Sequence, residues 1–292
     1  MTSAQPEGQG PPVSVERRCL NCGAALTGRY CASCSQAADV HVPSTRELIH
    51  EALEGITHSD SRLWNTLGLL WLKPGRLTQE FVAGRRAAYL PPFRLYLVLS
   101  IIFFLTASLS PMHARIIRFD DPRAPSPAQC ADLQGTLFGR DLGPRLQHAC
   151  GEIVRDNGTN LAHSWLATMP KAMFIFLPLV AFLHMLMYWR PRHKYAEHLL
   201  FFLHLHAYFF SLMTVAVLAS DAARAWSILA KLDSLGLLLP WFAALYTVLA
   251  MKRVFGRSWT GTLVKAVALF VVYVVVMCFT FAGVVLYAAL QL

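Results

Sequence analysis

Four cysteines near the N-terminus have the spacing of a metal site. Cys19, Cys22, Cys31 and Cys34 form the pattern C-x2-C-x8-C-x2-C. Two thiolates separated by two residues can bind one face of an ion, and four complete the tetrahedral shell that structural zinc prefers. A closed shell leaves no position for a substrate, so the spacing predicts a structural zinc ion. Two disulfides or free thiols are the alternatives, and a reducing cytoplasm disfavours the disulfides.

The remaining cysteines lie in two different environments. Cys130 and Cys150 fall in a polar stretch, residues 111–165, that we expect on the outer side of a membrane. An oxidising compartment favours a disulfide between them, and two free thiols are the alternative. Cys278 lies alone in an apolar stretch, where a small packing residue is a simpler interpretation than a nucleophile.

The apolar stretch AEHLLFFLHLHAYFFSL contains an unusual set of ionisable side chains. The possible polar cluster comprises Glu197, His198, His204, His206 and Tyr208. At about 100° per residue, Glu197, His204 and Tyr208 project from one helix face. One interpretation is a proton relay, a haem or a second metal site, with His184 as a further member. The alternative places Glu197 and His198 at the membrane interface and gives the deeper histidines interhelical hydrogen bonds, and the absence of HExxH-like spacing favours it.

A charged group precedes the first apolar stretch. Its members are Glu80, Arg85, Arg86 and Tyr89, with His58 and Asp60 upstream. They can form a site together. The simpler interpretation is that the two arginines contact phosphate headgroups at the membrane surface.

Composition indicates which elements position these residues. Hydrophobic residues make up 55% of the chain and charged residues 15%, which is far from the average of soluble proteins. The first 90 residues are ordinary in polarity, whereas residues 166–290 are apolar in long blocks. The sequence therefore predicts a mainly α protein, a polytopic bundle of membrane helices preceded by a small zinc-ribbon-like knuckle.

The predicted organisation follows the chain. A disordered tail (1–16) precedes the knuckle (17–38), a region of amphipathic or interfacial helices (44–90) and a transmembrane domain (91–292). Within 44–90 we expect helices at 44–57, 60–72 and 77–88, and residues 63–72 can either enter the bilayer or lie on it. The transmembrane domain has about five spans, at 93–109, 168–188, 196–219, 227–250 and 263–290.

Charge predicts the orientation of these spans. The first 16 residues have no apolar core of a signal peptide, so we expect a cytoplasmic N-terminus. The short loops at 190–195 and 251–262 are rich in Lys and Arg, as cytoplasmic loops are. Five spans then place the C-terminus outside. Because the basic residues flank apolar blocks, the net charge of +9 reflects membrane orientation, and we expect no nucleic-acid partner.

Three segments together resemble a known family. The stretches CLNCGAALTGRYCASCSQ, THSDSRLWNTLGLLWLKPG and EFVAGRRAAYLPPFRLYLVLS are similar to the bacterial membrane-protein family known as domain of unknown function 3667. Two residues depart from its pattern: Ser35 stands where the family has Gly, and Arg85 where it has Lys. The resemblance implies a zinc-ribbon protein of a bacterial inner membrane and brings no biochemical activity with it.

Three functions remain open. The first is a non-enzymatic membrane protein whose zinc head binds a cytoplasmic protein or organises the helices beside the bilayer, and the lack of a complete catalytic set favours it. The second is a transporter or proton-coupled channel that uses Glu197 and the histidines of the third span. The third is an intramembrane enzyme with a metal or haem.

Overall fold

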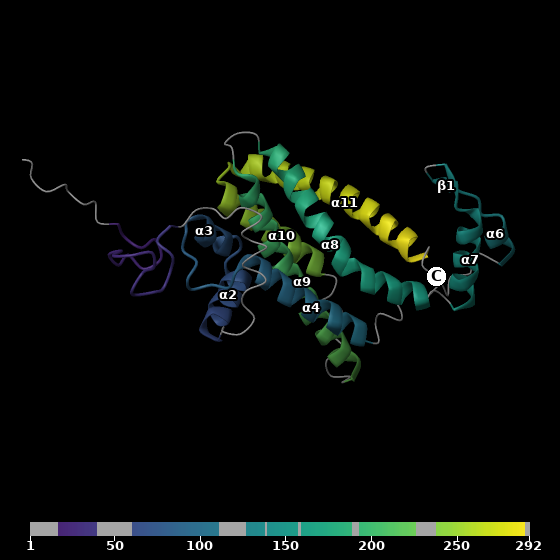
Figure 1. The fold of residues 1–292 in the computed structure, drawn as a ribbon, viewed down its shortest axis with the longest axis horizontal. Helices are drawn as coiled ribbons and strands as arrows, with labels where there is room; N and C mark the ends of the chain where they lie inside the picture. The colour runs from purple at the N-terminus through teal and green to yellow at the C-terminus, as the bar shows by residue number, and fades with distance from the viewer. Residues whose placement is uncertain are drawn as a thin grey trace, which may run out of the picture.

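The structure is a computed structural model. It describes residues 17–39, 60–110, 127–137, 139–156, 159–188, 193–225 and 238–289. The expected tail (1–16) and the expected helix at 44–57 lie outside these residues. The described chain is mainly helical (Figure 1), which confirms the predicted fold class.

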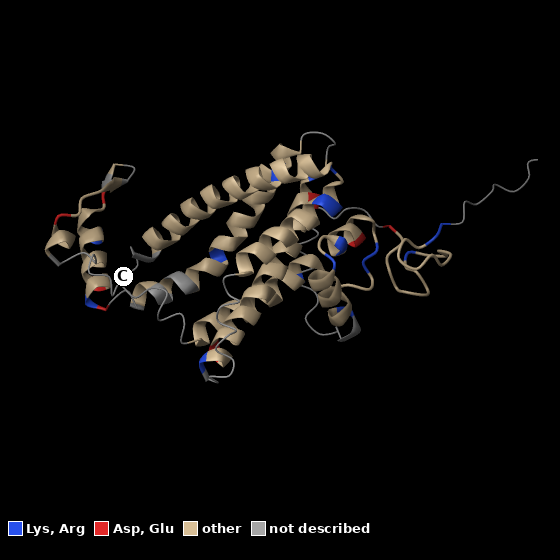
Figure 2. Cartoon of the chain, turned by 180° about the vertical axis from the view of Figure 1, so that it is seen from behind, with Lys and Arg blue, Asp and Glu red and all other residues tan. Residues whose placement is uncertain are grey.

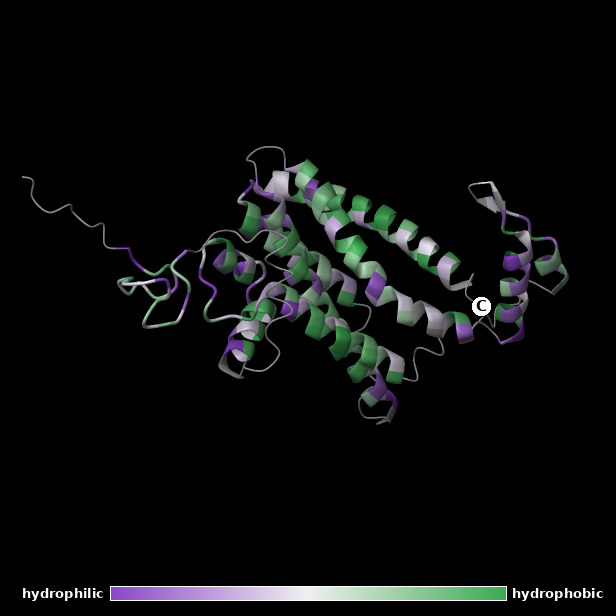
Figure 3. Cartoon of the chain, in the orientation of Figure 1, coloured by the Kyte–Doolittle hydropathy of each residue, from purple (hydrophilic) through white to green (hydrophobic). Residues whose placement is uncertain are grey.

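Four helices in the described ranges are long and apolar enough to cross a membrane. They are α4 (Pro92–Leu109), α8 (Thr159–Met187), α9 (Tyr195–Ala225) and α11 (Trp259–Ala289). Hydrophobic residues cover much of these helices (Figure 3). On α11, Phe270 and Phe279 are 68% and 77% exposed. Outward-facing aromatic side chains on a long helix suit a lipid surrounding, in which they need no protein partner.

The predicted span at 227–250 differs from the structure. Its place is taken by α10 (Leu239–Phe255), which has 17 residues and is too short to count among the candidate spans. Pro240 fits the first turn of α10, where a missing N–H costs nothing. Gly256, with φ of 61°, ends it. The described residues therefore contain four candidate spans where five were expected. The first half of the predicted span at 227–250 falls in residues 226–237, which lie outside the described ranges.

Helix α9 lies at the centre of the bundle. Of its spanning window, 67% is buried, against 17% for α11. It packs on α4 and α8, and its Phe201 and Phe202 are fully buried. A central helix can present polar groups to neighbours on every side, and the buried His198, His204 and His206 of α9 have such neighbours.

Helices α2 (Asp60–Leu72) and α3 (Arg76–Val82) form a hairpin against α9 and α10. A side chain at Gly75, where φ is 73°, would place its Cβ 2.8 Å from the Ala250 carbonyl oxygen, so the turn requires glycine. Tyr246 Oη donates to Leu70 O at 2.6 Å. The expected helix at 77–88 is shorter in the structure, because the chain leaves the helix at Ala83 and Gly84.

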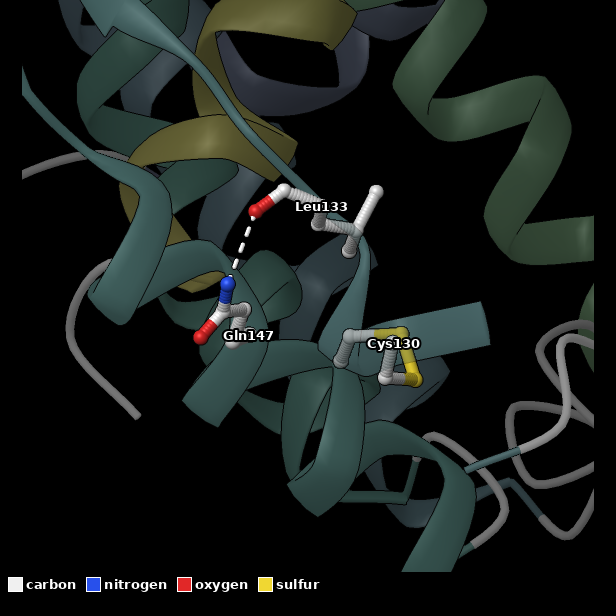
Figure 4. The surroundings of a disulfide bond; sticks show 4 residues. Cys130, Leu133 and Gln147 are labelled. Atoms are coloured by element: carbon white, nitrogen blue, oxygen red, sulfur yellow. Dashed lines mark hydrogen bonds between the residues drawn. A yellow bond between two sulfur atoms is a disulfide. The ribbon is translucent and has the colours of Figure 1, made fainter. Parts of the chain in front are cut away.

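The polar stretch between α4 and α8 contains ordered elements. These are α6 (Pro127–Ala131), β1 (Thr136–Leu137), β2 (Arg140–Asp141) and α7 (Gly143–Arg155), with β1 and β2 antiparallel. A disulfide joins Cys130 of α6 to Cys150 of α7 (Figure 4). Beside it, Gln147 Nε2 donates to Leu133 O at 3.0 Å. The segment from α6 to α7 lies at the end of the bundle opposite residues 17–39, which are purple in Figure 1.

Candidate metal centre

The four N-terminal cysteines lie on two knuckles of the same backbone design. In the first, Gly23 N donates to Cys19 O; in the second, Ser35 N donates to Cys31 O, and both distances are 2.8 Å. An isolated bridge flanks each knuckle, Arg18 with Ala25 and Tyr30 with Ala37. Each pair of cysteines is therefore held by local hydrogen bonds, which is why spacing along the chain suffices to recognise it.

The four Sγ atoms converge on one point. All lie within 4.8 Å of one another, with 3.6 Å between Cys19 and Cys34 and 3.5 Å between Cys22 and Cys31. A tetrahedral ion with metal–sulfur bonds of about 2.3 Å would need sulfurs about 3.8 Å apart. The arrangement thus fits a four-thiolate metal site.

Backbone amides prepare these thiols to bind a cation. The N–H groups of Cys34 and Ser33 lower the pKa of the Cys31 thiol to about 7, and the N–H of Cys22 lowers that of Cys19. The Ala24 N–H stabilises the Cys22 thiolate, but hydrogen bonding with the other thiols and desolvation outweigh it and raise its pKa to about 11. The Cys31 and Cys19 thiols therefore lose their protons more readily than an ordinary cysteine, and binding of an ion displaces the protons that remain on the four thiols.

One side chain connects the knuckle to the helical bundle. Gln36 Nε2 donates to Gly84 O at 2.8 Å, and Gln36 Oε1 accepts from the N–H groups of Arg86 and Ala87 at 3.1 and 3.2 Å. Gln36 is 7% exposed, so these three bonds are shielded from water. The sequence analysis missed this residue, and no local signal marks it because its partners lie about 50 positions away along the chain.

The charged group before α4 forms in part as expected. Glu80 pairs with Arg85 and, at 2.8 Å, with Arg76. The hydrogen bond from Arg85, followed by the positive charge of Arg76, lowers the pKa of the Glu80 carboxyl. Arg86 instead donates to Phe81 O. Sequence reasoning missed Arg76, although its i, i+4 spacing from Glu80 on one helix was available as a signal.

Of the members not yet placed, only Tyr89 has a side chain within the described residues. Tyr89 packs its ring against Phe81, and desolvation raises the pKa of its hydroxyl. His58 lies outside the described residues. The side chain of Asp60 is also outside them.

The polar residues of α9 form four separate pairs. Glu197 accepts from His193 at 2.8 Å, and the Nδ1 atoms of His198 and His184 are 2.8 Å apart. His204 pairs with Thr78 of α3 at 3.0 Å, and His206 pairs with Tyr273 of α11 at 3.2 Å. Within the described ranges, no hydrogen bond joins one of these pairs to the next.

The helix face predicted for Glu197, His204 and Tyr208 has a definite neighbour in the structure. His204 contacts α3, and Tyr208 lies edge to face with Trp71 of α2 at 5.7 Å. Glu197 shares a cavity wall with α3. The polar face of α9 is therefore the face that the α2–α3 hairpin covers.

Together these features describe a helical protein with candidate membrane spans and a four-cysteine head that can hold a metal. Residues 60–104 match the family described as Protein of unknown function (DUF3667), which confirms the resemblance noted from the sequence. The match covers α2, α3 and most of α4, and the knuckle lies outside it. No curated protein and no solved structure matches the chain.

Proposed function

We propose that the four-cysteine head binds one structural zinc ion and that this head organises the cytoplasmic surface of a membrane-embedded helical bundle. The observation that carries the proposal is the set of three hydrogen bonds between the buried Gln36 side chain and the backbone of residues 84–87. Gln36 is two residues beyond Cys34. An ion that fixes the second knuckle therefore fixes the residue that holds the α3–α4 connection.

Zinc is the ion that suits this donor set best. Four thiolates at tetrahedral spacing favour a soft or borderline cation, and a closed shell has no position for substrate. The metal then contributes folding free energy to a head of about twenty residues, which is too small to bury a core of its own.

The head also offers a surface for a cytoplasmic protein. Leu20 and Tyr30 project from the two knuckles and are 54% and 66% exposed. Exposed apolar surface marks docking sites when it is contiguous, and we take these two side chains as the centre of such a surface. We include partner binding in the proposed role, with the lipid bilayer as the surrounding of the rest of the chain.

The arrangement of the helices supports the proposed topology. Lys265 near the start of α11 donates to Met187 O at the end of α8, and His198 near the start of α9 contacts His184 of α8. Helices α9 and α11 therefore begin at the same end of the bundle. Helix α9 runs away from that end, so the chain must cross back to it before α11 begins. Helix α10, about 25 Å long, is the described part of that crossing.

This return gives five crossings in total. Lys and Arg gather at the end of the bundle beside the knuckle (Figure 2), and cytoplasmic loops have this bias. We therefore place the head on the cytoplasmic side of a bacterial inner membrane. The end of α11 then lies on the outer side, with the disulfide-linked segment.

Replacing Gln36 tests the organising role. Gln36→Ala removes all three bonds to the 84–87 backbone while leaving the cysteines intact, so we expect faster amide hydrogen exchange at residues 84–90 with unchanged zinc content. Gln79→Ala is the matched control, because among the described residues the Gln79 side chain donates to Arg253 O rather than to the knuckle. Unchanged exchange at 84–90 in Gln36→Ala would contradict the proposal.

A further inference from the structure

A cavity of about 350 Å³ lies where α3, the start of α9 and the end of α10 meet. Arg76 and Arg85 line one part of it, and Glu197 lines another. Val82 and Val254 add apolar surface. It lies at the same end of the bundle as the basic residues Lys252 and Arg253, which end α10, and therefore near the membrane surface in the topology proposed above.

Both arginines are held in place for a ligand. Each uses its Nε to contact Glu80, whose side chain is 7% exposed. Both side chains also reach the surface, since Arg76 is 49% and Arg85 is 38% exposed. Two guanidinium groups held by one buried carboxylate and lining the same cavity offer donors of the kind that binds a phosphate group.

The carboxylate of Glu197 supplies the opposite charge. Its Oε2 accepts from His193 Nδ1 at 2.8 Å, which leaves Oε1 available to a second donor. Glu80 and Glu197 balance the charges of Arg76 and Arg85. A ligand with one negative and one positive group therefore matches the cavity better than a purely anionic ligand.

We propose that this cavity binds the headgroup of a zwitterionic phospholipid, with the phosphate at Arg76 and Arg85 and the ammonium group at Glu197. The valines receive the first carbons of the lipid. Such a site gives the chain a preference for ethanolamine-type lipids over phosphatidylglycerol, whose headgroup has no cation for Glu197.

The test compares lipid binding by the detergent-solubilised full chain. Native mass spectrometry in equal concentrations of phosphatidylethanolamine and phosphatidylglycerol should show preferential retention of the first. Arg76→Gln should weaken its retention about tenfold or more, since a charge-assisted hydrogen bond is lost. Arg62→Gln is the matched control, because Arg62 is exposed on α2 and does not line the cavity.

A second variant separates headgroup recognition from folding. Glu197→Gln keeps the shape of the side chain. This variant should lose the preference for phosphatidylethanolamine, while its binding of phosphatidylglycerol should stay unchanged. Equal retention of both lipids by the unmodified chain, or equal effects of Arg76→Gln and Arg62→Gln, would overturn the proposal. So would displacement of the lipid by an equal concentration of inorganic phosphate, which would make free phosphate the ligand.

Discussion

Ser35 and Gly23 occupy the same position in the two knuckles, and both have a left-handed backbone, with φ of 58° and 77°. Each donates its N–H to the first cysteine of its knuckle. Among the described residues, Ser35 is the one non-glycine residue with positive φ. A side chain in this conformation costs roughly 1 kcal/mol, so the second knuckle is strained where the first is not.

Replacing Ser35 by glycine should therefore stabilise the head. We expect Ser35→Gly to hold zinc about 0.5–1 kcal/mol more tightly, since the ion binds only the folded knuckle. Gly23→Ser is the reciprocal change and should weaken binding by a similar amount. Competition with a chromophoric chelator measures both. Weaker zinc binding by Ser35→Gly would show that the serine hydroxyl contributes more than the backbone strain costs.

The same residues show how far sequence reasoning extends. The two cysteine knuckles and the bounds of α2 depend on local backbone geometry, so residue patterns predict them. The family resemblance identifies Ser35 as a position where glycine is usual. Gln36 and Gly84, or His204 and Thr78, are brought together by packing between distant segments, which periodicity does not encode. The polar face of α9 was predictable, but its cover by α2 and α3 was not, because apolar stripes do not specify their partners.

The metal site gives a second prediction. Cys22→Ser leaves an incomplete shell, so purified protein should lose its single zinc ion and the head should unfold while the long helices stay inserted. Elemental analysis and protease sensitivity of residues 17–39 measure this. The control is Cys278→Ser, because Cys278 is exposed on α11. This variant should keep its zinc ion. A metal-free unmodified chain with a protected head would refute the zinc assignment.

Acidification should weaken the Glu80 cluster. Because Arg85 and Arg76 lower the folded-state pKa of Glu80, its contribution is present above the ordinary carboxyl pKa of about 4.3 and is lost as the pH falls through the lower folded value. Glu80→Gln should cost about 1 kcal/mol at neutral pH, since both arginines are partly exposed.

The pH dependence distinguishes this from a general defect. The difference in melting temperature between Glu80→Gln and the unmodified chain should shrink as the pH is lowered from 7 towards 3. Glu152→Gln is the control, because its pair with Arg155 lies on the surface and contributes little. A difference for Glu80→Gln that stays constant over this range would contradict an ionic role.

The orientation of the bundle gives a fourth prediction. A reporter that is active only in the cytoplasm should work when fused before residue 1 or after residue 258, and it should fail after residue 292. In the proposed topology, residue 258 lies on the cytoplasmic side with the head, and residue 292 follows the outer end of α11. Activity after residue 292 would mean an even number of crossings, and α10 would then not return through the membrane.

The outer segment provides the last prediction, which tests topology through redox chemistry. The bond between Cys130 and Cys150 closes a loop across 20 positions, and such a closure contributes about 3 kcal/mol to local order. It can form only where the compartment is oxidising. Mass spectrometry of non-reduced, alkylated protein from intact cells should find a peptide that links Cys130 to Cys150.

The same experiment contains its own control in the knuckle. No crosslink should join Cys130 or Cys150 to Cys19 or Cys34, because the proposed topology places the head on the other side of the membrane with its thiolates bound to zinc. The double change of Cys130 and Cys150 to serine should raise amide exchange in α7 while leaving α8 and α9 unchanged. Alkylatable Cys130 and Cys150 that an impermeant reagent cannot reach would place this segment inside and reverse the proposed orientation.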